Sequence, residues 1–277
     1  MAPSRNVRKR VSTLLTAAAG AIALAALTAA PAAAHTVDFS NIVGTWQNAV
    51  PPGVVTITGP GTADPKARWG IPDPSPGPQS GYNFDAAAGI VTAMVPPSPS
   101  DDFTLGTFTH VNEPIASGTS ITGIQLAVTM DVSIDGNGQG SRTFLFDFTH
   151  DETPNGDTPC PYGGNDPSKP GGGPAPNGVG VNDNGCADRV TVNVDTATST
   201  FMIGGDTYTV NIEGFKVGSD FATDFLTEEQ NMDSAQLQAN VTLASTVIPG
   251  APEPASLAVL GVGLAGLGIL RRRKSRR

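Results

Sequence analysis

Strict alternation of apolar and polar residues runs through much of the middle of this 277-residue chain. In residues 124–134 every second side chain is apolar, and residues 144–148 repeat the pattern with three phenylalanines. Successive side chains of a β-strand point to opposite faces, so this period of two predicts strands with one buried and one solvated face. The turn-forming residues 135–138 lie between the two stretches and predict a hairpin.

The same alternation recurs further along the chain. Residues 190–194, 201–203 and 208–212 are expected to form a three-strand meander, and residues 235–243 a further strand. Only residues 226–233 are expected to form a short helix. Short strands separated by Gly, Pro, Asn and Asp turns favour an all-β fold, which we expect to be a β-sandwich of jelly-roll-like type.

The N-terminal segment has the three-part layout of a secretory signal peptide. Basic residues at positions 5–10 precede an apolar stretch over residues 11–30, and an Ala-x-Ala site occupies residues 32–34. We therefore expect residues 1–34 to be removed during export by the Sec machinery, and residues 35–248 to form the exported domain.

The charge of the chain changes once its ends are set aside. Residues 35–250 contain six Lys and Arg but 24 Asp and Glu, a net charge of about −18. Such a surface repels nucleic acids and anionic lipid headgroups, and it favours solubility or cation binding. Nucleic acid is therefore excluded as a partner of this domain.

An apolar run followed by a basic block ends the sequence. Residues 255–270 carry no charge and, as a helix, would reach about 24 Å, slightly short of a hydrocarbon core of about 30 Å. The basic block begins with Arg271, Arg272 and Arg273, which places this end in the cytoplasm by the positive-inside rule. We expect a single transmembrane helix that tethers the precursor to the inner membrane.

The order of features in residues 249–277 resembles the PEP-CTERM sorting signal. Pro252, Glu253 and Pro254 supply the motif, and the apolar helix and the arginines follow it. The resemblance implies recognition by exosortase, a membrane-embedded transpeptidase-like enzyme, in a Gram-negative bacterium that makes extracellular polysaccharide. It also implies removal of the helix and delivery of the domain to the cell surface or biofilm matrix. The alternative is an ordinary single-pass anchor.

Short motifs across residues 38–245 resemble the THxN family of PEP-CTERM proteins. They include Gly44-Thr45-Trp46, Trp69-Gly70, the stretch FTHVNEPI at 108–115 and HDETPN at 150–155. The family elements match Thr109, His110, Asn112, His150, Glu152 and Asn155. The resemblance implies family membership and carries no biochemical activity with it.

Two cysteines flank a long Gly- and Pro-rich segment without periodicity. In an exported protein, Cys160 and Cys186 are expected to form a disulfide, worth about 3.5 kcal/mol in the chain-entropy model. We expect no bound cofactor, but the acidic residues around this segment are candidates for a structural calcium ion, with solvated acidic loops as the alternative. They are Asp157, Asp166, Asp183 and Asp188.

Two histidines occupy echoing Phe-Thr-His sequences at strand ends. His110 shares its parity with Phe108, and His150 with Phe148, so both are expected to point inward at the rim of the sheets. We interpret them as structural, each hydrogen-bonded to a turn or a carboxylate. The alternative is a divalent-metal site formed by His110, Glu113, His150 and Glu152.

Catalytic motifs are sparse, and we do not expect an enzyme. The sequence contains neither G-x-S-x-G nor H-E-x-x-H, and its acidic pairs, at 101–102, 151–152 and 228–229, are expected on solvated turns. We expect a surface or matrix component that binds glycan, for which the aromatic residues are few. Besides Phe, they are Trp46, Trp69, Tyr82, Tyr162 and Tyr208.

The alternative function is an enzyme that modifies matrix polysaccharide, either a hydrolase or a metal-dependent oxidase. Cleavage after Ala34 would make His35 the N-terminal residue. An N-terminal His and a second His can together hold copper, as in lytic polysaccharide monooxygenases. Hydrolysis would instead require paired carboxylates, whose spacing depends on the fold.

Overall fold

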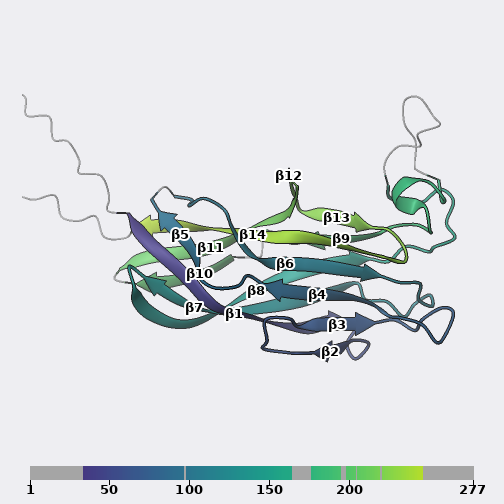
Figure 1. Cartoon of the computed structure of the whole chain (residues 1–277), viewed down its shortest axis with the longest axis horizontal. Coiled ribbons are helices and arrows are strands. Elements are labelled where there is room, and N and C mark those ends of the chain that lie inside the picture. The colour runs from purple at the N-terminus through teal and green to yellow at the C-terminus, as the bar shows by residue number, and fades with distance from the viewer. Residues whose placement is uncertain are drawn as a thin grey trace, which may run out of the picture. The chain divides into compact units, whose positions relative to one another are not determined.

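The described part of the chain folds into two antiparallel β-sheets. The computed structural model describes residues 34–96, 98–163, 176–194, 198–203, 205–218 and 220–245. Besides strands, these residues contain one short 3₁₀ helix, η1 (Gly180–Asn182), and no helix long and apolar enough to cross a membrane. Figure 1 labels the strands along the chain. The all-β prediction is confirmed.

The first sheet has six strands in the order β13-β9-β8-β7-β1-β5. Along the chain they are β1 (His35–Val50), β5 (Val91–Val95), β7 (Gly123–Ile134), β8 (Asn137–Asp151), β9 (Asp188–Val192) and β13 (Asp224–Thr227).

The second sheet follows the order β10-β11-β14-β6-β4-β3-β2, and β12 pairs with β11 beside this path. Its strands are β2 (Thr56–Thr58), β3 (Lys66–Trp69), β4 (Ser80–Ala86), β6 (Phe103–Asn112), β10 (Thr198–Ile203), β11 (Asp206–Val217), β12 (Asp220–Ala222) and β14 (Asn231–Ser245).

The predicted hairpin is formed by β7 and β8. Ile134 pairs with Asn137, so the turn consists of Asp135 and Gly136, which have φ angles of 50° and 77°. Two successive positive φ angles characterise the tight turn that matches the twist of a hairpin, and Gly tolerates this backbone without strain. The inward face of β8 carries Phe144, Phe146 and Phe148, all buried.

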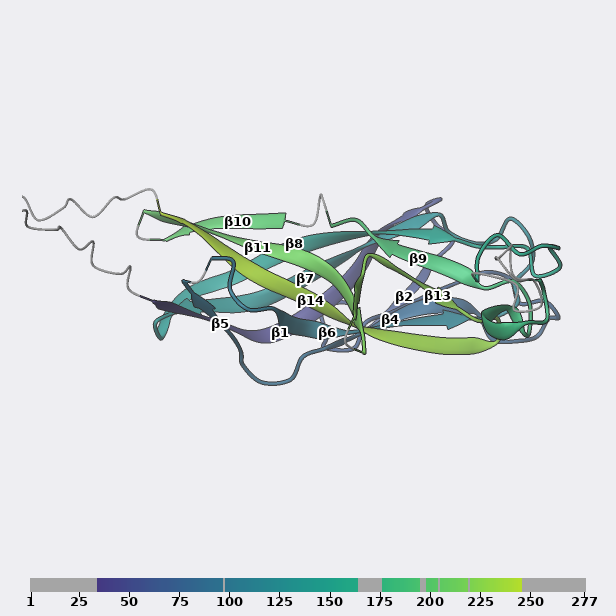
Figure 2. The ribbon, with the colours of Figure 1, turned by 90° about the horizontal axis from the view of Figure 1, so that it is seen from above.

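Aromatic rings from the two sheets meet in one core. Phe39 of β1 stacks on Phe103 of β6 with ring centroids 5.2 Å apart. Phe108 of β6 stacks on Phe148 of β8 at 4.9 Å. Figure 2 shows the layers from a second direction. The sheets therefore face each other across a core of buried side chains, the arrangement that the predicted β-sandwich requires.

Two local predictions were wrong. The expected meander is divided, because β9 pairs with β8 and β13 in the first sheet, whereas β10 and β11 form a hairpin in the second. The expected helix over 226–233 is absent as well. Its residues end β13, turn at Gln230 with a φ of 60°, and begin β14.

Candidate functional site

The inward rows of β6 and β8 each contain a histidine near the end of the strand. His110 continues the row of Phe108, and His150 continues that of Phe148, and both side chains are buried. The two imidazole rings meet edge to face with centroids 5.2 Å apart. His110 also lies opposite Tyr82 of the neighbouring strand β4. Both histidines point inward, as the sequence predicted, and the facing of the two sheets brings their titratable rings together.

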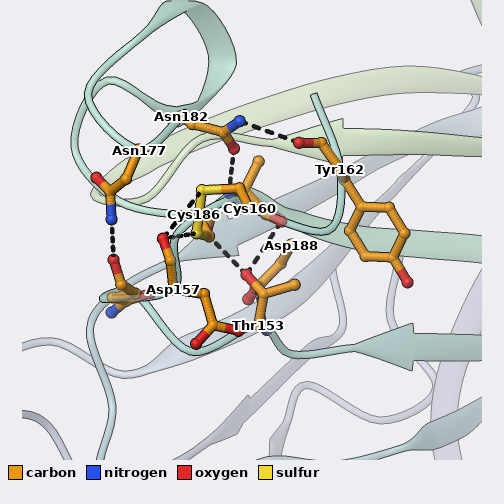
Figure 3. Close-up of a disulfide and its surroundings, with 10 residues drawn as sticks. Thr153, Asp157, Cys160, Tyr162, Asn177, Asn182, Cys186 and Asp188 are labelled. Carbon is orange, nitrogen blue, oxygen red and sulfur yellow. Dashed lines mark hydrogen bonds between the residues drawn. A yellow bond between two sulfur atoms is a disulfide. The ribbon is translucent and has the colours of Figure 1, made fainter. Parts of the chain in front are cut away.

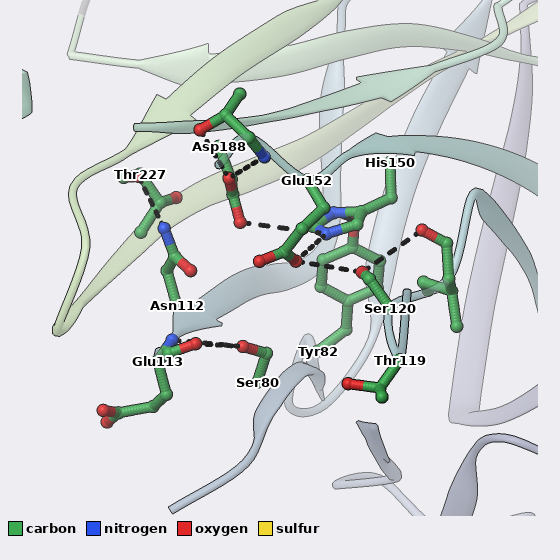
Figure 4. Close-up of polar contacts among 12 residues, drawn as sticks. Ser80, Tyr82, Asn112, Glu113, Thr119, Ser120, His150, Glu152, Asp188 and Thr227 are labelled. Atoms are coloured by element: carbon green, nitrogen blue, oxygen red, sulfur yellow. Dashed lines mark hydrogen bonds and ion pairs between the residues drawn. The ribbon is translucent and has the colours of Figure 1, made fainter. Parts of the chain in front are cut away.

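Hydrogen bonds fix the orientation of His150. Its Nδ1 lies 2.8 Å from the hydroxyl of Tyr82, and its Nε2 lies 3.2 Å from a carboxylate oxygen of Glu152. The same oxygen of Glu152 accepts a hydrogen bond from Ser120, as Figure 4 shows. Trp69 packs edge to face against the ring. His150 therefore makes the contact with a carboxylate that the structural interpretation expects.

His110 does not follow that interpretation. Within the described residues, neither of its ring nitrogens has a hydrogen-bond partner, although the side chain is fully buried. Buried polar atoms are almost always paired, because leaving them unpaired costs about 1–3 kcal/mol. His110 is therefore a feature that packing alone does not explain.

Asp188 approaches the two histidines from β9. One carboxylate oxygen, Oδ1, accepts hydrogen bonds from the backbone N–H and the hydroxyl of Thr153, at 2.7 and 3.1 Å. The other oxygen, Oδ2, lies 3.9 Å from Nε2 of His150 and has no hydrogen-bond partner in the part described. The side chain is fully buried. Thr153 therefore holds Asp188 so that its second oxygen faces the histidines.

A second group of buried polar side chains lies between β13 and β14. The amide of Asn112 donates to the backbone carbonyl of Thr227 at 3.1 Å, which leaves its own oxygen unpaired among the described residues. Glu229 is buried in the turn before β14, and neither of its carboxylate oxygens makes a hydrogen bond within the described residues. The pair at 228–229 was predicted to be solvated, and for Glu229 this was wrong because its side chain is buried beside the backbone of Gly185.

Burial shifts the protonation of several of these groups. Loss of hydration, followed by the charge of Glu152, raises the pKa of Asp188 to about 9. The same two causes raise the pKa of Glu229 from 4.5 to about 7, and the nearby amides oppose this only in part because neither reaches hydrogen-bonding geometry. Burial and then His150 lower the pKa of His110. Burial, then Asp188 and Glu152, raise the pKa of Tyr82.

We expect Glu229 to make stability depend on pH. Because its pKa rises from 4.5 to about 7 on folding, its contribution is fully present below pH 4.5 and is lost as the pH rises through 7. The free energy of unfolding of the unmodified protein should therefore fall by about 1–3 kcal/mol between pH 4.5 and 7. Replacing Glu229 by Gln should abolish this fall. Chemical denaturation of both proteins from pH 4 to 8, with a chelator present, measures the difference.

The matched control for this prediction is Glu228→Gln, one residue away. The Glu228 carboxylate accepts a hydrogen bond from Asn184 at an exposed site. This variant should keep the pH dependence of the unmodified protein. Parallel stability curves for Glu229→Gln and the unmodified protein would contradict the assignment.

A pocket of about 680 Å³ adjoins this cluster. Its lining includes His150 and Glu152 together with the loop residues 115–118 and 153–155. The side chain of Glu152 is 22% exposed, whereas those of His150 and Asp188 are not exposed at all. Glu152 therefore lies between the solvent-filled pocket and the buried groups.

The structure places the predicted metal ligands unequally. Glu152 contacts His150, whose ring meets that of His110, but the carboxylate of Glu113 points away from His150 (Figure 4). Asp188, which was not in that set, lies in the cluster instead. Its inward parity with Val190 and Val192 was the sequence signal that could have placed it there. Among the other family-motif residues, Thr109 bonds Ser234 at 2.8 Å, and the side-chain oxygen of Asn155 is buried without a partner in the described part.

The candidate calcium ligands do not gather into one site among the described residues. The one group of three or more potential ligands there is His110, His150 and Asp188. Asp183 is exposed in the turn after η1, and Asp157 contributes its backbone carbonyl near the cysteine sulfurs. Asp166 lies outside the described residues. A calcium ion near the cysteine segment stays a prediction.

The predicted disulfide between Cys160 and Cys186 is present (Figure 3). Both cysteines are buried. The hydroxyl of Thr153 shares its hydrogen between the backbone carbonyl of Cys186, at 2.9 Å, and the carboxylate of Asp188. The bridge therefore anchors the segment that leads directly into β9 and the buried cluster.

The aromatic residues do not form a binding groove for glycans in the described region. Trp46, Trp69, Tyr82 and Tyr208 are buried in the core. The fifth, Tyr162, is half-buried and stacks against the guanidinium of Arg189 at 4.4 Å. Stacking on sugar rings therefore cannot use these side chains as they stand.

His35 lies far from the other two histidines. It begins β1 and bonds Asp135 at the hairpin turn of β7 and β8, whereas His150 lies at the opposite end of that hairpin. The 12 residues of β7 separate the two ends by roughly 30 Å or more. A copper site that combines His35 with His110 or His150 is therefore ruled out.

Comparison with known proteins identifies the C-terminal segment. Residues 251–274 match the family model of the PEP-CTERM protein-sorting motif. The match includes Pro252, Glu253 and Pro254 and the arginines at 271–273, all outside the described residues. A search of curated proteins found no match to this chain. The sorting-motif prediction is confirmed, and membership of the THxN family stays a prediction.

Proposed function

We propose that this protein is an exosortase substrate that is exported as a membrane-tethered precursor and released to the cell surface or extracellular matrix. The match of residues 251–274 to the PEP-CTERM sorting motif carries this proposal. The host would be a Gram-negative bacterium, and the partners would be the Sec machinery, exosortase and the extracellular polysaccharide. Residues 1–34 and the tail after residue 248 would both be removed.

The composition of the chain supports this route. The uncharged residues 255–270 supply an apolar segment of about the length of a bilayer core, and the following arginines retain the C-terminus in the cytoplasm. A disulfide between Cys160 and Cys186 suits an oxidising compartment outside the cytoplasm. A domain with a net charge of about −18 stays soluble after release.

We propose a non-enzymatic role for the released domain, which we take to be a β-sandwich. The alternative, an enzyme that modifies matrix polysaccharide, draws support from the pocket beside His150 and Glu152. A substrate in that pocket would reach Glu152 and the edge of His150, but His110 and Asp188 are buried and do not line it. A cluster with so little of its surface within reach of a substrate favours a structural purpose.

The proposal predicts a processed product. In cells with exosortase, the intact mass of the protein should lack both residues 1–34 and the apolar tail, and the product should leave the inner membrane. In cells without exosortase, the tail should remain and hold the protein in the membrane. Mass spectrometry of membrane and released fractions from both strains measures this.

The matched control alters the motif alone. Replacing Pro252, Glu253 and Pro254 by Ala leaves the apolar segment and its arginines intact, so the variant should be tethered and stay unprocessed in both strains. Identical masses and membrane location in both strains for the unmodified protein would instead make the tail a plain anchor, and the proposal would fail.

A further inference from the structure

Three buried side chains converge on one point between the sheets. His110 comes from β6 of the second sheet, and His150 and Asp188 come from β8 and β9 of the first. One potential ligand atom of each lies within 4.8 Å of the other two. All three residues are at least nine-tenths buried, and the whole set faces inward.

The free atoms at this point are those that a metal ion uses. Both nitrogens of His110 and Oδ2 of Asp188 have no hydrogen-bond partner in the described chain. Nε2 of His150 is directed to the same place, 3.9 Å from that oxygen of Asp188. Imidazole nitrogens and a carboxylate oxygen are the usual ligands of zinc and related ions.

Among the described residues, no Lys or Arg supplies a counter-charge at this point. Within the described residues Asp188 has no ion pair with a Lys or Arg, and the neighbouring Arg189 is engaged by Asp151 at 2.6 Å on the other face of β9. A buried carboxylate is costly unless it is protonated, paired or bound to a metal. A cation between the histidines and Asp188 would meet this need.

We propose that His110, His150 and Asp188 bind one divalent transition-metal ion, for which Zn²⁺ is the probe, with Glu152 as the fourth ligand. This proposal is independent of the sorting proposal. The two imidazoles favour such an ion over Ca²⁺, which prefers six or more oxygen ligands. The oxygen of Glu152 already lies 3.2 Å from Nε2 of His150.

The required movement is small. Three atoms that are at most 4.8 Å apart have a common point no more than about 2.8 Å from each, whereas zinc takes nitrogen and oxygen ligands at about 2.0–2.2 Å. Each side chain must therefore close by at most about 0.7 Å, which small χ rotations can supply. The hydroxyl oxygen of Tyr82, 2.8 Å from Nδ1 of His150, would accept a hydrogen bond from the N–H at that nitrogen and fix the ring for coordination through Nε2.

Such an ion would join the two sheets at the end of the fold where the disulfide also lies. Its ligands come from both sheets, and the pocket beside Glu152 gives it a path from solvent. We therefore infer a structural metal that fastens the sheets, rather than a catalytic one with an open coordination position.

The test uses the full-length protein with a tag that binds no metal. After chelation and dialysis, Zn²⁺ should rebind at one equivalent and raise the melting temperature by about 5–10 °C at a 100-fold excess over Kd, whereas Ca²⁺ should not. Co²⁺ should give the visible absorption of a four-coordinate nitrogen and oxygen site. No binding of Zn²⁺ and no Co²⁺ absorption would overturn the proposal.

Variants locate the ion. His110→Gln and Asp188→Asn should each weaken Zn²⁺ binding at least about 100-fold, and Tyr82→Phe about 10- to 100-fold. Asn at position 188 keeps an oxygen for the hydrogen bonds from Thr153, so this variant should fold. His35→Gln and Glu113→Gln are the matched controls and should bind as the unmodified protein does. Full binding by Asp188→Asn, or loss of binding in the controls, would place the metal elsewhere and contradict the assignment.

Discussion

Replacing Phe108 by Ala should lower the free energy of unfolding by about 3–5 kcal/mol, which is the usual cost of removing a fully buried aromatic ring. Phe108 is completely buried in β6. Its ring contacts those of five aromatic residues drawn from both sheets, which are Trp46, Tyr82, Phe148, Phe215 and Phe225. The cavity left by the ring would lie at the centre of the packing between the sheets. Chemical denaturation followed by tryptophan fluorescence measures the change.

Phe221→Ala is the matched control for this substitution. Phe221 lies on the short strand β12, is 47% exposed, and has the amine of Lys216 5.8 Å from its ring centroid. Its removal should cost less than about 1 kcal/mol. Equal losses for the two variants would mean that the rings around Phe108 do not form the main contact between the sheets.

Periodicity predicted which side chains are buried more reliably than it predicted which strands pair. The hairpin of β7 and β8 could be predicted because the alternation and the Asp135-Gly136 turn lie next to each other in sequence. The position of Val190 in the alternating pattern was equally clear, but such a position specifies the face of the sheet on which a side chain lies and not the neighbouring strand. β9 therefore joins β8, some 40 residues earlier in the chain, instead of β10.

Local propensity misled the prediction for residues 226–233. Leu, Glu, Gln and Met favour helices, and this segment contains all four. In the fold, pairing of Leu226 with Arg189 and of Asn231 with Asn112 overrides that preference. The buried position of Glu229 follows from these long-range pairings, so no local signal in the sequence could have revealed it.

The candidate site was predictable in part, for the same reason. The inward direction of His110 and His150 followed from the rows of phenylalanines that precede them. That they meet depends on β6 and β8 facing each other across the core, which alternation does not specify. Asp188 had the inward parity of β9, but we grouped it with the acidic residues of the cysteine segment as a candidate calcium ligand. An acidic residue at an inward position of a strand is therefore a more informative sequence signal for this site than an acidic residue in a loop.

Removing the disulfide should cost about 3.5 kcal/mol of stability. The bridge closes a loop between residues separated by 26 positions. In the chain-entropy model, loss of such a cross-link raises the conformational entropy of the unfolded chain, which lowers the free energy of unfolding by about this amount. Cys160→Ala/Cys186→Ala is the suitable variant, because Ala introduces no polar atom where both cysteines are buried. Urea denaturation should also show a larger m-value, since an unfolded chain without the cross-link exposes more surface.

The reduced form of the unmodified protein is the control for this variant. It lacks the bridge but keeps both side chains, so agreement between the two assigns the loss to the cross-link itself. Two hydrogen bonds that remain in the variant should keep the loss of stability from being larger. Thr153 still donates to the carbonyl of residue 186, and the N–H of Ala187 still donates to Asn182 at 2.8 Å. A loss below about 1 kcal/mol with an unchanged m-value would mean that these hydrogen bonds, and not the disulfide, hold the segment beside Asp188.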